Sequence, residues 1–85
     1  MDDQIIPLQL KFTAIKRGIE DNMIVNTYCR MIRKNDIVIY VYEKIIPPEG
    51  MNWHYGSTPI DINTDFNSLG MIPVNGIIQF TATIE

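Results

Sequence analysis

The chain has 85 residues, 46% of them hydrophobic, and carries 7 basic and 10 acidic residues for a net charge of −3. This length and content indicate one small folded domain, residues 1–85, and argue against wholesale disorder. The acidic charge argues against general nucleic-acid binding, the single cysteine excludes an intrachain disulfide, and no apolar run reaches the roughly 20 residues of a membrane helix.

The first half of the chain predicts strands. Residues 7–16 alternate between apolar and polar side chains, which is typical of a half-buried strand with Leu8, Leu10, Phe12 and Ala14 on its inner face. Residues 17–22 are polar and contain a glycine, so they predict a turn. Residues 23–33 combine helical spacing with β-branched residues and leave strand or helix open. We favour a hairpin from Met23 to Ile45 that turns around Arg33–Asp36.

The second half predicts shorter elements and a final strand. Pro47 and Pro48 end the hairpin, because proline cannot continue a ladder in mid-sheet. Residues 51–55 predict a short strand, and residues 60–68 predict a polar loop or a short edge. Residues 76–85 predict a strand with one apolar face, formed by Ile78, Phe80, Ala82 and Ile84.

The backbone groups of the final strand need a hydrogen-bonding partner. We expect this strand to lie beside the first one, with pairing to a neighbouring subunit's sheet as the alternative. Thr81, Thr83 and Glu85 would then keep its outer face polar. The predicted fold is mostly β, a small antiparallel β-sandwich or partly open barrel.

Two short stretches resemble known families. Residues 46–71, IPPEGMNWHYGSTPIDINTDFNSLGM, resemble the second half of a ubiquitin-like domain in the spacing of Ile46, Pro47, Pro48, Trp53, Tyr55, Ile60, Phe66, Leu69 and Met71. That resemblance implies a β-grasp fold with one helix at residues 35–44 and a role as an interaction module. The β-branched content of residues 35–44 favours a strand instead. Residues 72–84 are similar to a strand entry of jelly-roll heads in viral fibres and complement/tumour-necrosis-type trimers, with matches at Pro73, Gly76 and Phe80.

The candidate chemical groups lack the companions that catalysis or metal binding requires. His54 is the only histidine, and no nucleophile motif accompanies it or Cys29. Asp61, Asn63 and Asp65 have the spacing that opens a calcium loop, but the sixth position is Phe66 and the twelfth is Ile72. Polar residues in a turn explain the pattern more simply. We therefore predict no enzyme activity and no cofactor.

The charges and the aromatic residues instead suggest contacts with other proteins. All basic residues lie in the first 44 positions, which predicts one basic and one acidic face. Aromatic residues often anchor protein contacts. The predicted contact residues are therefore Trp53, His54, Tyr55, Arg30, Arg33 and Lys34.

We expect a non-catalytic structural or assembly protein, and within that class we favour a minor capsid, decoration or tail component of a virus or phage. Its partners would be protein subunits, either copies of itself as a homo-oligomer or a larger scaffold, and not nucleic acid or membrane. The alternatives are a ubiquitin-like interaction module and a small inhibitor that binds a basic partner surface. The acidic start, MDDQIIPLQL, is unlike a secretory signal peptide, which predicts a cytoplasmic or virion location.

Overall fold

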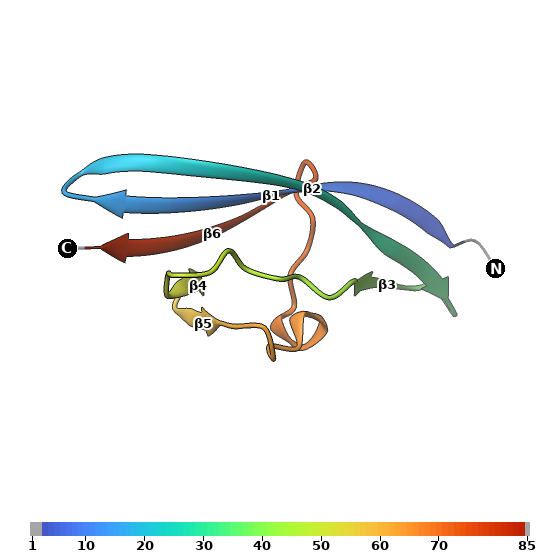
Figure 1. Ribbon diagram of the computed structural model, residues 1–85. Helices are drawn as coiled ribbons and strands as arrows, with labels where there is room; N and C mark the ends of the chain where they lie inside the picture. The colour runs from blue at the N-terminus through green and yellow to red at the C-terminus, as the bar shows by residue number, and fades with distance from the viewer. Residues whose placement is uncertain (1–2, 85) are drawn as a thin grey trace.

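The computed structural model describes residues 3–84, which form one mixed sheet with the strand order β3-β2-β1-β6-β4-β5. The sheet curls into an open half-barrel (Figure 1). These residues contain the strands β1 (Gln4–Lys16), β2 (Ile19–Lys34), β3 (Ile37–Tyr42), β4 (Trp53–Tyr55), β5 (Thr58–Ile60) and β6 (Ile77–Ile84), and the 3₁₀ helix η1 (Phe66–Leu69). The predicted mostly-β class is confirmed. In this part of the chain, no helix has the length and hydropathy needed to cross a membrane.

Two tight turns set the pairing of the first three strands. Arg17 and Gly18 have φ values of 52° and 78°, and Asn35 and Asp36 have 51° and 64°. Two consecutive positive φ values define the type I′ turn, whose twist matches that of a hairpin. The hairpin turn predicted within 33–36 is confirmed, and residues 23–33 are strand. The turn predicted at 17–22 is wrong beyond Gly18, because a two-residue turn lets β2 begin at Ile19.

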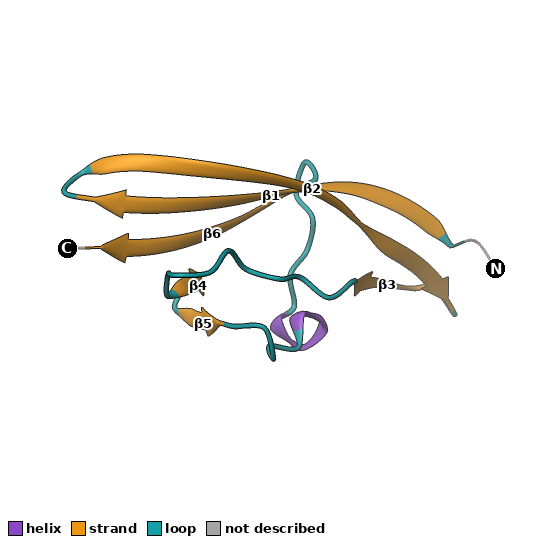
Figure 2. Cartoon of the chain, in the orientation of Figure 1, coloured by secondary structure: helices purple, strands orange, loops and turns teal. Residues whose placement is uncertain are grey.

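The last strand lies beside the first, as predicted, with Phe80 opposite Phe12 and Ala82 opposite Ala14. The two strands run parallel, so the sheet is mixed rather than wholly antiparallel. A parallel neighbour requires a long crossover. Residues 43–76 form it, passing below the long strands β1, β2 and β6 and carrying β4, β5 and η1 (Figure 2).

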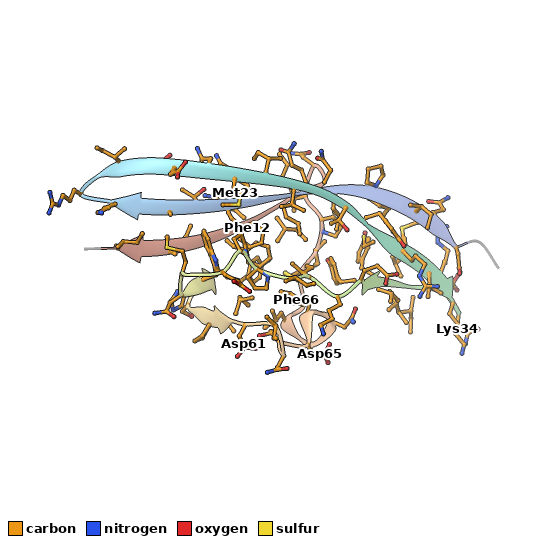
Figure 3. The ribbon with its side chains drawn as sticks, in the orientation of Figure 1. Phe12, Met23, Lys34, Asp61, Asp65 and Phe66 are labelled. Atoms are coloured by element: carbon orange, nitrogen blue, oxygen red, sulfur yellow. The ribbon has the colours of Figure 1, made fainter. Side chains whose placement is uncertain are left out.

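The core lies between the long strands and this crossover. An aromatic cluster forms its centre: Phe12 stacks on Phe80 with ring centroids 4.9 Å apart, and Trp53 meets Phe12 edge-on at 5.1 Å. Phe66 of η1 closes the cluster from below, edge-on to Phe80 (Figure 3). The apolar alternation predicted for β1 and β6 thus builds the core.

The β-grasp alternative is wrong. It requires a helix at residues 35–44, but Ile37–Tyr42 is strand β3, paired with Cys29–Lys34 of β2. Each of the six β3 residues is β-branched or tyrosine, and such side chains pack better on a pleated sheet than on a helix.

Candidate functional site

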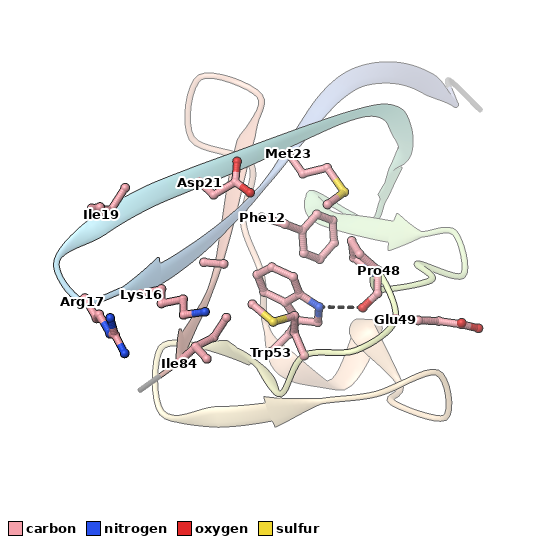
Figure 4. A pocket seen from close by; sticks show the side chains of 12 residues that line it. Phe12, Lys16, Arg17, Ile19, Asp21, Met23, Pro48, Glu49, Trp53 and Ile84 are labelled. Atoms are coloured by element: carbon pink, nitrogen blue, oxygen red, sulfur yellow. Dashed lines mark hydrogen bonds between the residues drawn. The ribbon is translucent and has the colours of Figure 1, made fainter.

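A groove of about 580 Å³ opens beneath the turn of the β1–β2 hairpin (Figure 4). Phe12 and Trp53, both buried, form its floor. Apolar side chains form its walls, including Met23 of β2, Met51 of the crossover and Ile84 of β6. Charged side chains also line it: Lys16, Arg17, Asp21 and Glu49. We call this feature the hairpin groove.

The alternation of β1 and β2 places the upper wall of the hairpin groove. Residues directly opposite each other in an antiparallel pair share a face, and Phe12 lies opposite Met23 while Lys16 lies opposite Ile19. The floor is held by a hydrogen bond, because the indole Nε1–H of Trp53 donates to the carbonyl oxygen of Pro48 at 2.8 Å. The groove is therefore a built feature of the sheet and the crossover.

The β2 half of this hairpin is exposed on both faces. Every residue from Ile19 to Asn26 is exposed, although all belong to a strand. On the inner face, Ile19 is 73% exposed and Met23 is 48% exposed. On the outer face, Ile24 is 47% exposed. A sheet normally packs at least one face, but neither face of this stretch is covered by residues 3–84.

The same stretch has an unpaired backbone edge. β3 pairs with β2 only from Cys29 to Lys34, so residues 19–28 have no neighbour on that side among residues 3–84. Residues that flank a two-residue turn form a hydrogen-bonded pair, and such pairs alternate along an antiparallel ladder. Odd-numbered residues of β2 therefore bond to β1. From Ile19 to Thr27, the even-numbered ones, Glu20, Asn22, Ile24 and Asn26, point their N–H and C=O groups outward. We call residues 19–28 the free edge.

The two outermost strands of the sheet are blocked in part, β3 at its last residue and β5 by its shortness and its proline. The backbone N–H of Tyr42, at the end of β3, donates to Oδ1 of Asn67 at 2.7 Å, and Asn67 Nδ2 donates back to the Tyr42 carbonyl at 3.4 Å. At the opposite end of the sheet, β5 has only three residues and contains Pro59. Short strands and proline are ordinary ways of blocking an edge. The free edge of β2 has neither.

The predicted aromatic contact residues are divided between the core and its border. Trp53 is 3% exposed and belongs to the core, and only its groove-lining part could meet a partner. Tyr55 is half-buried, with its ring 5.9 Å from that of Phe80. His54 lies opposite Thr81 of β6 and Pro59 of β5, and it is also half-buried.

The predicted basic contact residues lie far from the hairpin groove. Arg30 is half-buried, with its Nε 3.8 Å from Oε1 of Glu43. Arg33 and Lys34 are exposed at the end of β2 opposite the β1–β2 turn (Figure 3). Lys16 and Arg17 lie at the turn itself, so basic residues are present at both ends of the hairpin.

Sequence reasoning missed Ile19, Met23 and Met51, which line the groove, and it missed the free edge. The alternation of Ile19, Met23 and Val25 was the available signal. It was obscured because Glu20, Asp21 and Asn22 resemble turn residues.

The acidic loop after β5 forms local hydrogen bonds. Asp61 Oδ1 accepts from the backbone N–H of Asn63 at 2.7 Å and from the Thr64 hydroxyl at 3.2 Å. Asp65 Oδ1 accepts from the N–H of Asn67 at 3.0 Å and so caps η1. These contacts agree with the predicted polar loop. Within residues 3–84, no three His, Cys, Asp or Glu side chains gather as a metal site would require.

Two titratable groups are buried opposite each other at the β2–β3 junction. Burial raises the pKa of the Cys29 thiol above its ordinary value. Burial, followed by the nearby Cys29, Tyr55 and Tyr40, raises the pKa of Tyr42 to about 12. Within residues 3–84 the Tyr42 hydroxyl has no hydrogen-bond partner. Both groups are thus kept neutral inside the core.

Replacing Tyr42 by phenylalanine is expected to stabilise the protein by about 1 kcal/mol at pH 7, because it removes a buried hydroxyl without a partner.

The stability of the wild-type protein should also depend on pH through Tyr42. An unfolded tyrosine ionises near pH 10, whereas folded Tyr42 ionises near 12. The wild-type free energy of unfolding should therefore fall as pH rises from 10 to 12, with Tyr42 contributing at most about 1.4 kcal/mol per pH unit. Urea titrations across this range should show a shallower fall in Tyr42→Phe. Tyr28→Phe, at an exposed position, should change stability at pH 7 by less than about 0.5 kcal/mol.

Comparison of the chain with protein-family models, curated proteins and solved structures found no match. Its function is therefore inferred from the hairpin groove and the free edge.

Proposed function

We propose that this protein is a non-catalytic assembly protein that binds other protein subunits through the exposed half of β2. Its main partner is a second copy of itself. The observation that supports this most strongly is the stretch Ile19–Tyr28, which combines apolar side chains exposed on both faces with an unpaired backbone edge. Covering either feature with another protein subunit would be energetically favourable. Burial of apolar surface contributes about 25 cal/mol per Å², and an exposed edge is a template for another strand.

The shape of the molecule supports a structural role. It is elongated, with principal extents of 48 × 21 × 18 Å, and the β1–β2 hairpin reaches along its length (Figure 1). A small domain with a modest core gains stability when a subunit contact completes that core. We place the protein in the class of minor capsid, decoration or tail components, where small β-rich subunits assemble by such contacts.

Solution mass tests this proposal. Light scattering over a wide concentration range should show association that increases with concentration. The association should persist at high salt, because apolar and backbone contacts are screened little by ions. Met23→Lys should abolish it, whereas Ile37→Lys, which changes an exposed isoleucine on β3 by the same charge, should not.

Three results would contradict the proposal. A monomer at every concentration would exclude self-assembly. Association that disappears in high salt would indicate that the charged ends of the hairpin form the contact instead. Association unaffected by Met23→Lys would place the contact outside the exposed half of β2.

A further inference from the structure

We infer that the free edge of β2 pairs antiparallel with the free edge of a second copy, around a two-fold axis that passes beside Met23. This inference rests on the proposed function and specifies which residues of the two copies meet. The result is one continuous sheet of two half-barrels, with both inner faces on the same side. The geometry of the free edge specifies the partner and the register.

The backbone allows only some registers. An antiparallel pair exchanges hydrogen bonds between residues whose N–H and C=O groups both point into the interface. On the free edge these are the even-numbered residues, so even-numbered residues of one copy must face even-numbered residues of the other. Odd-numbered residues then face odd-numbered ones, and side chains of the inner faces stay together. A two-fold axis can therefore pass beside a residue, never between two.

Strand β3 limits how far the second copy can extend. Tyr42 of β3 already occupies the position beside Cys29. The tight turn at Arg17–Gly18 of the second copy can therefore lie beside Tyr28 but cannot extend to Cys29. Ile19 of the second copy can therefore reach Thr27 and no further. The longest register that satisfies both conditions pairs residues 19–27 with residues 27–19 of the second copy and places Met23 opposite Met23.

The side chains in this register fit a second copy. Glu20 faces Asn26 and Asp21 faces Val25 of the second copy, so no acidic residue faces another. Met23 meets Met23 on the inner face, which extends the apolar wall of the hairpin groove. The free edge contains no proline, lysine or arginine, the residues that ordinarily block strand edges.

The ends of the paired strands are also complementary in charge. The turn residue Arg17 of the second copy comes next to the end of β3, where Glu43 is 46% exposed and has only a long contact with Arg30. By symmetry the same contact forms twice. An isologous interface requires such self-complementarity of one surface patch.

Single-cysteine variants test the register directly. Residues facing each other in a non-hydrogen-bonded pair have Cα atoms about 4.5 Å apart, within the range that a disulfide spans. Met23→Cys should therefore form a covalent dimer rapidly under mild oxidation. Asn22→Cys and Ile24→Cys lie diagonally from their own copies, at about 7–8 Å, and should cross-link poorly. The native Cys29 is fully buried, so the wild-type protein should stay monomeric on a denaturing gel.

Two further variants complete the experiment. Ile37→Cys places a thiol on β3 at a position that is 61% exposed, against 48% for Met23, and reports random collision. Ile24→Pro, added to Met23→Cys, removes an N–H that points outward from the free edge and leaves every N–H that bonds to β1 in place. The double variant should cross-link at least tenfold more slowly than Met23→Cys, while its circular dichroism spectrum remains that of the folded protein.

The outcomes separate this inference from the proposed function. Cross-linking of Met23→Cys alone supports the two-fold pairing. The protein could associate by light scattering while Asn22→Cys or Ile24→Cys cross-links better than Met23→Cys, or while none of the three variants cross-links. Either result overturns the inference and leaves the proposed function standing. If the protein is monomeric at all concentrations, both are overturned.

Discussion

Phe80→Ala is expected to destabilise the protein by about 3–5 kcal/mol, the usual effect of deleting a buried aromatic ring. Phe80 is 0% exposed and stacks on Phe12 at 4.9 Å with an interplanar angle of 15°. It also contacts the rings of Tyr55 and Phe66, so it joins β1, the β4 strand and η1. Small domains have about 5–15 kcal/mol of stability in total, so this variant should lose a large fraction of it.

Urea unfolding followed by tryptophan fluorescence measures this effect, because Trp53 lies in the same cluster. Ile77→Ala is the control on the same strand: Ile77 is 47% exposed on the opposite face and should cost less than about 1 kcal/mol. A loss below about 1 kcal/mol for Phe80→Ala would show that the aromatic cluster is not the centre of the core.

Gly76→Ala is expected to destabilise the protein by about 2–3 kcal/mol, for two additive reasons. Gly76 has a φ of +68°, a conformation that disfavours a side chain. A Cβ there would also lie 3.0 Å from the backbone oxygen of Pro7. That oxygen belongs to β1, and the carbonyl of Gly76 accepts the N–H of Gln9 at 2.6 Å. The added methyl group would therefore separate β6 from β1 where their parallel pairing begins.

Gly70→Ala separates the two reasons. Gly70 has a nearly identical φ of +66°, but nothing lies within 4 Å of a Cβ built on it. Its substitution should cost about 1–2 kcal/mol from backbone strain alone. Denaturant midpoints of the two variants give the difference. If Gly76→Ala were no worse than Gly70→Ala, β6 would not approach β1 as closely as described.

The alternation of side chains predicted the core faces but not the direction of pairing. Leu8, Leu10 and Phe12 on β1, and Ile78 and Phe80 on β6, are buried as their spacing indicates. A period of two specifies which face is buried and is the same for parallel and antiparallel neighbours. The parallel pairing depends on the long crossover, and no local pattern encodes its path.

The candidate site was harder to predict, because its parts are distant in sequence. Phe12, Met23, Trp53 and Ile84 come together only through the sheet order. Trp53 was predicted to be a surface anchor, since an aromatic residue in a short strand looks the same whether exposed or buried. Its burial depends on the Pro48 carbonyl that accepts its N–H.

The most direct test of the free edge and its role is residue-resolved amide hydrogen exchange at several protein concentrations. At low concentration, the N–H groups of Met23 and Val25 should be protected by β1, while those of Asn22, Ile24 and Asn26 exchange rapidly. At high concentration, Asn22, Ile24 and Asn26 should become protected as a second copy pairs with them. Equal exchange at odd and even positions, or alternation that never changes with concentration, would contradict the account.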